Sequence, residues 1–504
     1  MARAIEFKDV SFSYENTKEE KALKHINVSI RQGEVILVCG RSGCGKTSFT
    51  RMINGLIPHF YDGVLDGSVF LNGNNHSKKP LYQTAELVGS VFQNPKSQFF
   101  TVETDSEIVF ASENMAKSRE QICENFERTV EALGIEKLLG KSLFALSGGE
   151  KQKIACASVF TLDPEIVVMD EPTSNLDVRA IRDLTEIVRR WKAEKKTVVI
   201  AEHRIGWLLD VADRVIVMEH GSVSRDIPMR EFQKMDQEEG RKLGLRMPGK
   251  EAWRDNVEQE KEKAGVGLFS CTFSYRGEKE KRALDIEKLE IPKHAVVAVL
   301  GENGAGKSTF ARCLCGLEKK QKGRIQFDRV EKSRKQRLKE TCLVMQDVNR
   351  QLFTESVWDE MLLSIEALYG KEKGDQERAK RQAEQILREL NIDQYKDVHP
   401  MALSGGEKQR VAIAGALLSG RKIVIYDEPT SGLDYISMRK TATLIGKMKE
   451  RGTTQFLITH DKELLDACCD YILFLENGKV KYAGAYQGEI RGRVEAFFNP
   501  EERG

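Results

Sequence analysis

The sequence of 504 residues predicts an α/β protein that consists of two tandem copies of one domain. Two motifs occur once in each half: a glycine-rich motif at residues 40–47 and 301–308, and the pentapeptide Leu-Ser-Gly-Gly-Glu at 146–150 and 403–407. Their copies lie 261 (301 minus 40) and 257 (404 minus 147) residues apart. The repeating unit is therefore a whole domain and not a short solenoid repeat. Apolar runs that alternate with helical patterns predict a largely parallel sheet in each copy.

The first half begins with two segments of alternating polarity, at residues 4–14 and 26–30, which are typical of strands at an exposed sheet edge. A continuous apolar run at 34–39 ends at a glycine and predicts a buried strand that leads into the first glycine-rich motif. Beyond that motif we predict helices at residues 47–54, 148–161 and 178–195, and strands at 67–73, 87–93, 166–170 and 197–202.

A mainly helical insertion is expected between residues 94 and 146. Ile122, Phe126, Val130 and Leu133 recur there at steps of three and four residues, the spacing of an amphipathic helix. The α/β core of the first half is thus interrupted by a helical subdomain.

The second half repeats this order. We predict strands at 295–300, 423–427 and 455–459, and an insertion helix at 379–390. Between the halves, residues 231–264 are polar and densely charged, with too little apolar surface for a core of their own, which predicts a linker that is helical in part. The expected organisation is a first domain at 1–230, a charged linker at 231–264 and a second domain at 265–504.

The composition excludes some classes of function. The 79 basic residues balance the 77 acidic ones, so no bulk attraction to nucleic acid is expected. No apolar stretch is long enough for a signal peptide or a membrane-spanning helix. The ten cysteines lack zinc-site spacing, which predicts reduced, structural thiols and a cytosolic location.

The glycine-rich motifs have the form of phosphate-binding loops. Glycines let backbone amides approach a phosphate, and the helix that follows presents its positive end. Lys46 and Lys307 would then reach the β- and γ-phosphates of ATP, and the hydroxyls of Thr47 and Ser308 would ligate Mg²⁺. A glycine turn with an incidental lysine is a weak alternative, because the motif follows a buried strand twice. The remaining nucleotide-binding residues expected in the loops are Gly40, Ser42, Gly43, Gly45 and Ser48, and Gly301, Asn303, Gly304, Gly306 and Thr309.

Two carboxylates end a buried strand in each half. Asp170 and Asp427 can hold Mg²⁺ through its water shell, and the adjacent Glu171 and Glu428 can polarise the attacking water. Acids at a strand end are also compatible with simple solvation. The neighbouring phosphate loops favour the catalytic interpretation.

Together these motifs resemble the nucleotide-binding domains of ABC transporters, in the order typical of that family and over both halves. The resemblance implies two tandem P-loop ABC ATPase domains, each with a mainly parallel sheet core, an antiparallel β subdomain and a helical subdomain. Leu-Ser-Gly-Gly-Glu is the most discriminating element. In the family it closes the nucleotide site of the opposite domain, which implies that Ser147, Gly148 and Gly149 face the ATP on Lys307, and that Ser404, Gly405 and Gly406 face the ATP on Lys46.

The resemblance assigns further roles. Gln93 and Gln346 would sense Mg²⁺ and the attacking water, and His203 and His460 would contact the γ-phosphate. The stretches 174–177 and 431–434 resemble the loop that couples the two sites. Tyr14 and Tyr275 would stack on adenine, although packing in the core remains an alternative for both. Because neither half lacks a lysine, a catalytic glutamate or a histidine, we predict two hydrolysing sites.

Two segments are similar to the ATPases of energy-coupling factor (ECF) transporters: residues 91–100, Val-Phe-Gln-Asn-Pro-Lys-Ser-Gln-Phe-Phe, and residues 201–204, Ala-Glu-His-Arg. In those importers the ATPases drive a transmembrane T component and a substrate-binding S component at the cytoplasmic face of the membrane, for a vitamin or a metal ion. Phe92, Phe99, Phe100 and Phe353 are candidate anchors for a coupling helix of the membrane partner, or core residues of the insertion. The second half keeps Gln-Leu-Phe at 351–353 but lacks Asn-Pro. This difference, and Glu202 against Thr459, indicate distinct docking roles.

Two other classes remain open. Tandem-domain ATPases of ABC sugar importers have a similar length, but one of their sites is often weakened. Soluble translation factors with two ABC domains act on the ribosome, but the arm between their domains is usually longer and strongly basic. The transported substrate is not encoded in any pattern of this chain.

Overall fold

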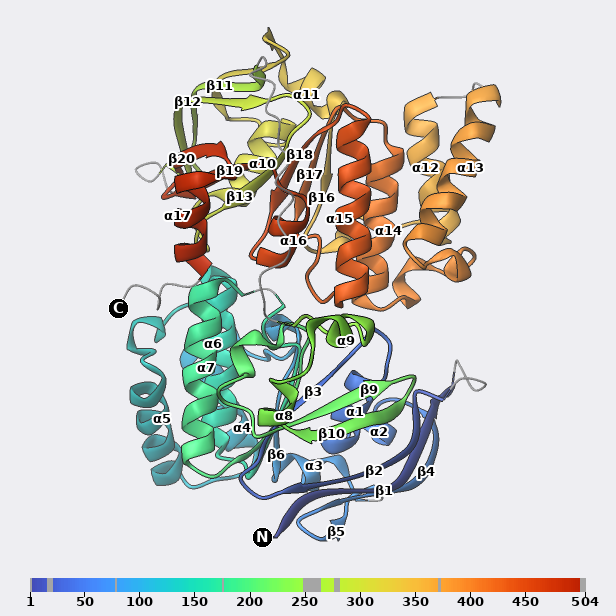
Figure 1. Ribbon diagram of the computed structural model, residues 1–504. Coiled ribbons are helices and arrows are strands. Elements are labelled where there is room, and N and C mark those ends of the chain that lie inside the picture. The colour runs from blue at the N-terminus through green and yellow to red at the C-terminus, as the bar shows by residue number, and fades with distance from the viewer. Residues whose placement is uncertain are drawn as a thin grey trace. The chain divides into compact units, whose positions relative to one another are not determined.

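The computed structural model describes residues 2–15, 21–77, 79–174, 176–247, 264–275, 282–369 and 373–498. The chain forms two compact units, the first formed mainly by Met1–Gly249 and the second comprising most of Lys250–Gly504. Each unit contains a six-stranded sheet, a four-stranded antiparallel sheet and a set of helices (Figure 1). The predicted α/β class is confirmed. Residues 248–263 of the predicted linker lie outside the described residues.

The six-stranded sheets of the two units have the same strand order. It is β10-β9-β3-β8-β7-β6 in the first unit and β20-β19-β13-β18-β17-β16 in the second. Neighbouring strands are parallel except for the outer pairs β9/β10 and β19/β20, which are antiparallel. The strands of the first sheet are β3 (Val35–Gly40), β6 (Val88–Val91), β7 (Ile166–Asp170), β8 (Thr197–Ala201), β9 (Arg214–Glu219) and β10 (Ser222–Pro228). Those of the second are β13 (Val296–Leu300), β16 (Thr341–Val344), β17 (Ile423–Asp427), β18 (Thr454–Ile458), β19 (Tyr471–Glu476) and β20 (Lys479–Ala485).

Continuous apolar runs form the central strands of these sheets, as predicted. Every residue of β3 and β13 is buried. Strands that are covered by helices on both faces need apolar side chains at every position rather than at alternate ones. The ends of β3 and β13 therefore deliver the glycine-rich motifs to the carboxyl edge of each sheet.

The antiparallel sheets have the orders β2-β1-β4-β5 and β12-β11-β14-β15. The prediction that residues 4–14 form an edge strand is wrong, because β1 pairs with both β2 and β4. One face of β1 packs on the unit, with Phe7 stacked on Phe49 at 4.5 Å between ring centroids. Alternating polarity reports one covered face and does not distinguish an inner strand from an edge strand. The strands are β1 (Arg3–Tyr14), β2 (Leu23–Arg31), β4 (Gly63–Leu71) and β5 (Asn74–Asn75), and β11 (Ala264–Phe273), β12 (Leu284–Pro292), β14 (Lys322–Phe327) and β15 (Val330–Glu331).

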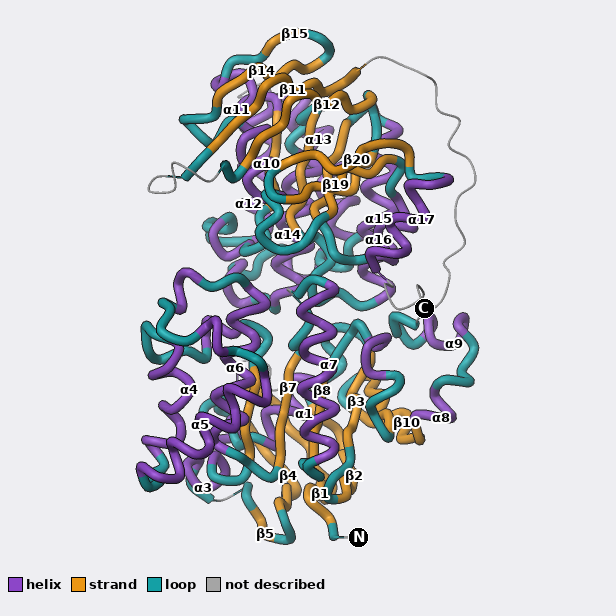
Figure 2. Tube along the Cα trace, turned by 90° about the vertical axis from the view of Figure 1, so that its left-hand side faces the viewer, coloured by secondary structure: helices purple, strands orange, loops and turns teal. Residues whose placement is uncertain are grey.

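The predicted helical insertion is present in both units. In the first, α4 and α5 pack against α6 (Figure 2), and in the second α12 and α13 pack against α14. None of the described helices combines the length and the apolar character that crossing a membrane requires. Helices of the first unit are α1 (Lys46–Ile53), α2 (Leu56–His59), α3 (Leu81–Ala85), α4 (Thr104–Asn114), α5 (Arg119–Leu133), α6 (Gly148–Leu162), α7 (Val178–Ala193), α8 (Met229–Phe232) and α9 (Gln237–Lys242). Those of the second are α10 (Lys307–Cys315), α11 (Arg334–Glu340), α12 (Val357–Tyr369), α13 (Lys373–Glu389), α14 (Gly405–Leu418), α15 (Tyr435–Glu450), α16 (Lys462–Cys468) and α17 (Gly488–Phe498).

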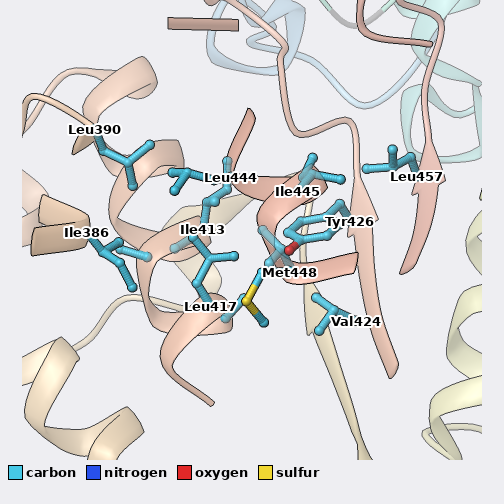
Figure 3. Close-up of a cluster of buried hydrophobic side chains, with 14 of the residues drawn as sticks. Ile386, Leu390, Ile413, Leu417, Val424, Tyr426, Leu444, Ile445, Met448 and Leu457 are labelled. Carbon is cyan, nitrogen blue, oxygen red and sulfur yellow. The ribbon is translucent and has the colours of Figure 1, made fainter. Parts of the chain in front are cut away.

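Helices and sheet share one hydrophobic core in the second unit (Figure 3). Ile386 of α13, Ile413 of α14 and Ile445 of α15 all contribute to it, together with Tyr426 of β17. The helices of the insertion pack in the same core as the sheet. The helix α14, which begins at the Ser-Gly-Gly motif, is therefore held in place relative to the strands that carry the acids.

The start of the predicted linker belongs to the packed part of the first unit. Phe232 and Leu245 are buried in the core of that unit, and Met247 packs against it. Between residues 231 and 247, the part of this segment that the structure describes, the large apolar side chains all pack on the first unit, which a count of composition does not reveal.

All ten cysteines are free thiols. Burial raises the pKa of Cys156 to about 12, so this thiol is not reactive near neutral pH. The absence of pairing agrees with the prediction, and seven of the ten thiols are buried, whereas Cys123 is exposed.

Trp191 offers a test of the core of the first unit. It lies on the apolar stripe of α7 with Leu184, Ile187 and Val188, is 1% exposed and stacks on Phe160. We expect Trp191→Ala to lower the free energy of unfolding by about 3–5 kcal/mol, because it leaves a large cavity. Urea unfolding followed by circular dichroism measures this change.

The matched control is Arg189→Ala in the same helix. The Arg189 side chain is 51% exposed and pairs with Glu186, so its loss should change the free energy of unfolding by about 0.5 kcal/mol or less. Equal unfolding midpoints for the two variants would contradict the packing of α7.

Candidate functional site

The glycine-rich loops follow β3 and β13 and run into α1 and α10. Gly40 and Gly301 have φ values of 146° and 145°, in a region that side chains disfavour. A Cβ at Gly40 would lie 2.2 Å from the carbonyl oxygen of Met218, and one at Gly301 would lie 2.3 Å from that of Leu475. The loops can therefore take this path only with glycine at their first positions.

Each loop encloses the side chain of its lysine. The Nζ of Lys46 donates to the carbonyl oxygens of Gly40 (3.1 Å) and Arg41 (3.0 Å). That of Lys307 donates to Gly301 (2.7 Å) and Glu302 (2.9 Å). Both lysines are buried, so a positive charge is held at the centre of each loop, beside the first turn of a helix. This is the electrostatic arrangement of an anion site.

A hydroxyl and a carboxylate meet beside each loop. Thr47 Oγ1 donates to Asp170 Oδ1 at 3.3 Å, and Ser308 Oγ donates to Asp427 Oδ2 at 2.9 Å. Burial, with the neighbouring Glu171 as the next cause, raises the pKa of Asp170 to about 7. Burial also raises the pKa of Asp427. Two hard oxygen donors side by side fit Mg²⁺, which prefers oxygen ligands.

In the first unit, two predicted catalytic residues contact the carboxylate of a third. Gln93 Nε2 donates to Glu171 Oε2 at 2.8 Å, and His203 Nε2 lies 3.4 Å from Glu171 Oε1. Burial pushes the pKa of Glu171 upward, but His203 and Lys46 outweigh this effect and hold the pKa below its usual value. Glu171 is therefore ionised and directed at the site.

The second unit repeats this geometry with small differences. His460 Nε2 lies 3.8 Å from Glu428 Oε1, and the backbone N–H of His460 donates to Glu428 Oε2 at 3.4 Å. Gln346 follows β16 and is exposed, as Gln93 follows β6. The predicted residues thus occupy corresponding places at the two sheet edges.

Both glutamates predicted to be catalytic have a left-handed backbone. The φ angle is 44° at Glu171 and 53° at Glu428. A non-glycine residue in this region costs on the order of 1–3 kcal/mol and persists only where its surroundings impose it. Such strain at the same position of both units is typical of functional sites.

The Ser-Gly-Gly motifs form the N-termini of α6 and α14. Ser147 and Ser404 are N-caps that accept a hydrogen bond from the backbone of Glu150 and Glu407, and each glutamate bonds back to the serine N–H. This capping box fixes where the helix begins. The exposed N-terminus presents free amides and the positive end of the helix dipole.

The two tyrosines lie at the ends of the antiparallel sheets. Tyr14 Oη is 2.9 Å from Ser48 Oγ, and Tyr275 Oη is 3.0 Å from Thr309 Oγ1. Each tyrosine thus connects its sheet to the helix after the phosphate loop. Tyr14 also makes edge contacts with Phe12 and Tyr61, and Tyr275, which is 40% exposed, makes one with Phe273. Stacking on adenine stays a prediction for both.

Two buried glutamates were missed in the sequence analysis. Glu107 Oε2 accepts from the backbone N–H groups of Phe100 and Thr101, and Glu360 Oε1 accepts from those of Phe353 and Thr354. Both glutamates follow the predicted sensing glutamine by 14 residues (107 minus 93, 360 minus 346). This equal spacing is the signal that could have identified them.

A model of the ABC transporter family matches residues 23–174 and 284–431. The chain therefore belongs to the ABC transporter family, as a protein with two fused ATP-binding domains, and ATP hydrolysis is its expected activity.

Relatives of similar length carry matching names. An ABC transporter ATP-binding protein of Treponema denticola is 40% identical over 499 residues, which cover 98% of this chain and 100% of that protein. Another from Methanosarcina mazei is 30% identical over 547 residues, with 99% and 90% covered. Among solved structures, the archaeal ribosome recycling factor aABCE1, in complex with the stalk protein aP1, has a TM-score of 0.63 at 22% identity, with 97% of this chain and 92% of that chain covered. That likeness is one of fold.

Gly405 offers a test of the anion site at α14. A Cβ at Gly405 meets nothing within 4 Å, so Gly405→Ala should leave stability intact. If amides at this N-terminus approach a phosphate, the added methyl group obstructs them, and we expect ATP turnover to fall to half or less, because one of two sites is affected.

Gly446→Ala is the matched control. This glycine lies within α15 and its Cβ would also meet nothing within 4 Å. The substitution should stabilise the unit by up to about 1 kcal/mol and leave turnover unchanged. Steady-state ATPase assays and thermal unfolding of both variants decide the matter, and full turnover in Gly405→Ala would exclude a ligand at this position.

Proposed function

We propose that the chain is the ATP-hydrolysing energy-coupling subunit of an ECF-type importer for a vitamin or metal ion, bound at the cytoplasmic face of the membrane through transmembrane T and substrate-binding S components. One observation carries this proposal: in both units the segment after the sensing glutamine is built in the same way and presents an exposed phenylalanine. Phe100 is 76% exposed and Phe353 is 73% exposed.

The framework of this segment is the same in both units. Gln98 Oε1 accepts from the backbone N–H of Phe92 at 3.2 Å, and Gln351 Oε1 accepts from that of Met345 at 3.1 Å. A buried glutamate, Glu107 or Glu360, holds the other end of the segment. Pro95 and Val348 are both buried at the same place, so the missing Asn-Pro of the second half leaves the framework unchanged.

The phenylalanines of this region differ in burial. Phe99 packs against the core of the helical insertion, and Leu352, in the same place of the second unit, is buried. Phe100 stacks on Phe110 with 5.1 Å between ring centroids and remains exposed. Of the anchors predicted from the sequence, Phe100 and Phe353 are therefore the ones we propose for docking.

An open cleft at the end of α4, the helix on which Phe100 stacks, supports the docking of a partner helix. It has a volume of about 600 Å³ and is lined by residues of α3 and of the end of α4, among them Leu81, Tyr82 and Met115. Phe110, the stacking partner of Phe100, lies one turn before the end of α4. Apolar anchors beside an open cleft are the usual means by which an amphipathic helix is bound.

We assign the chemistry to the predicted residues. Lys46 and Lys307 would bind the β- and γ-phosphates of ATP, with the loop amides around them. Mg²⁺ would be held by Thr47 and Asp170, and by Ser308 and Asp427, where it would neutralise charge on the phosphates. Glu171 and Glu428 would accept the proton of the attacking water, which Gln93 and Gln346 would orient. His203 and His460 would contact the γ-phosphate. The pairing of each Ser-Gly-Gly motif with the lysine of the other half stays a prediction.

A translation factor is the alternative from another class. Co-purification distinguishes the two: detergent-dependent association with small membrane proteins supports the transporter, and association with ribosomes supports the factor. Reconstitution with the T and S components, followed by ATP-dependent uptake, tests the proposal directly.

The two sites are expected to hydrolyse ATP equally well. Glu171→Gln and Glu428→Gln should each reduce ATP turnover to a similar extent, and the double variant should lose about 10² to 10⁴ in rate, because the base for the attacking water is gone at both sites. Steady-state ATPase assays measure this. Unchanged turnover in either single variant, or complete loss in only one of them, would show that the sites are not equivalent.

Phe100 and Phe353 are expected to anchor the membrane partner. The variant Phe100→Ser/Phe353→Ser should lose transport and co-purification with the membrane components but keep basal ATP turnover, since both side chains are exposed and outside the catalytic groups. Val330→Ser, which removes another exposed apolar side chain from the antiparallel sheet of the second unit, is the matched control and should leave uptake normal. Normal uptake in the double variant would rule out these anchors.

A further inference from the structure

A buried threonine follows each catalytic glutamate by two residues. Thr173 Oγ1 donates to Glu202 Oε2 at 2.6 Å, and Thr430 Oγ1 donates to Asp461 Oδ2 at 2.6 Å. Both threonines are 0% exposed, and both acids are 2% exposed. The same hydroxyl therefore bonds to a carboxylate in both units, but the carboxylate comes from a different position of the sequence.

The two acids lie on opposite sides of the histidine. The first unit reads Glu202-His203-Arg204, and the second reads Thr459-His460-Asp461. Each unit has one acid in this tripeptide, and the order is reversed. Glu202 and Thr459 are both buried. The difference between them, interpreted from the sequence as a sign of distinct docking roles, therefore lies inside each unit and not on a docking surface.

Each acid also bonds to the segment that carries the histidine. Glu202 Oε1 accepts from the backbone N–H groups of His203 at 2.7 Å and Arg204 at 3.1 Å. Asp461 Oδ1 accepts from the N–H of Leu464 at 3.2 Å and so caps α16. The corresponding 3₁₀ turn of the first unit, Ile205–Leu208, has no side-chain cap. In both units, then, one carboxylate links the segment of the catalytic glutamate to the segment of the histidine.

We propose that Glu202 and Asp461 are positioning residues for ATP hydrolysis, which fix the catalytic glutamate and the histidine of their own unit relative to each other from opposite sides of the histidine. The inference rests on the roles proposed above for Glu171, Glu428 and the two histidines. The histidine to glutamate distances, 3.4 Å and 3.8 Å, are the quantity that this link controls.

The electrostatics of Glu202 favour a functional reason for its presence. Burial raises the pKa of Glu202, and the nearby Glu171 raises it further. A buried acid beside another acid is an unfavourable way to satisfy one hydroxyl, for which a neutral acceptor would suffice. What a neutral group cannot supply is two acceptor oxygens at once: Oε2 binds Thr173 while Oε1 binds the two N–H groups.

The test uses two variants of the full chain. The acid-free variant, Glu202→Thr with Asp461→Arg, gives both units the tripeptide Thr-His-Arg. The exchanged variant, Glu202→Thr, Arg204→Asp, Thr459→Glu and Asp461→Arg, gives each unit the tripeptide of the other and has the same composition as the wild type. Maximal turnover, KM for ATP and thermal unfolding are measured for both.

We expect the acid-free variant to lose about 10- to 100-fold in kcat, because misplacement of catalytic groups by about 1 Å has effects of this size. Its KM for ATP should stay within about threefold of the wild type, since the phosphate loops are intact. The exchanged variant should recover at least half of the wild-type kcat. A fold defect would lower the unfolding temperature, so a fall in kcat in an acid-free variant that still unfolds at the wild-type temperature reports misplaced catalytic groups.

Two results would overturn the inference: wild-type kcat in the acid-free variant, or no recovery in an exchanged variant that unfolds at the wild-type temperature. If the acid-free variant does not fold, Glu202→Gln with Asp461→Asn replaces it and is judged by the same fall in kcat, because an amide offers only one acceptor oxygen. Wild-type turnover no faster than that of Glu171→Gln/Glu428→Gln would instead refute the site assignment on which the inference rests.

Discussion

The parallel pairing of two neighbouring strands is the constraint on which both sites depend. Asp170 of β7 pairs with Ala201 of β8, and Asp427 of β17 pairs with Ile458 of β18. The ladder continues one residue further, where Glu171 N–H donates to the carbonyl oxygen of Ala201 and Glu428 N–H to that of Ile458. Because parallel strands end at the same edge, this register places acid, glutamate and histidine together before any side chain interacts.

The same constraint imposes a cost in backbone strain and in buried charge. The chain turns away from the sheet at Glu171 and Glu428 in a left-handed conformation. In the first unit, Asp170, Glu171 and Glu202 lie close together, and burial raises the pKa of the first and the last of them. Lys46 and His203 keep Glu171 ionised. The site is thus held by the surrounding sheet against its own electrostatic repulsion, as is typical of functional sites.

The sequence was informative wherever one local pattern has one structural solution. An apolar run that ends in Asp-Glu predicted β7 and β17 to the residue, and the glycine motifs predicted loops whose backbone only glycine can adopt. Patterns that depend on a distant neighbour were less informative. Polarity along residues 4–14 could not reveal that β1 has a strand on each side, and two adjacent phenylalanines, Phe99 and Phe100, could not be separated into a core residue and an exposed one. Glu107 and Glu360 were missed because their role is to bind the backbone of another segment.

The exchange of Glu202 for Asp461 shows why a single position can mislead. A comparison of residues 202 and 459 alone indicates that the second unit has lost an acid. Each unit nevertheless keeps one acid beside its histidine. What the fold requires is an acceptor for the buried hydroxyl of Thr173 or Thr430, since an unpaired buried hydroxyl is costly. Residues on either side of the histidine can reach that hydroxyl, because positions i and i+2 of an extended chain point to the same side. A duplicated chain therefore provides its own comparison: the property that both copies share is a carboxylate at one point in space, and the position in the sequence that supplies it is free to change.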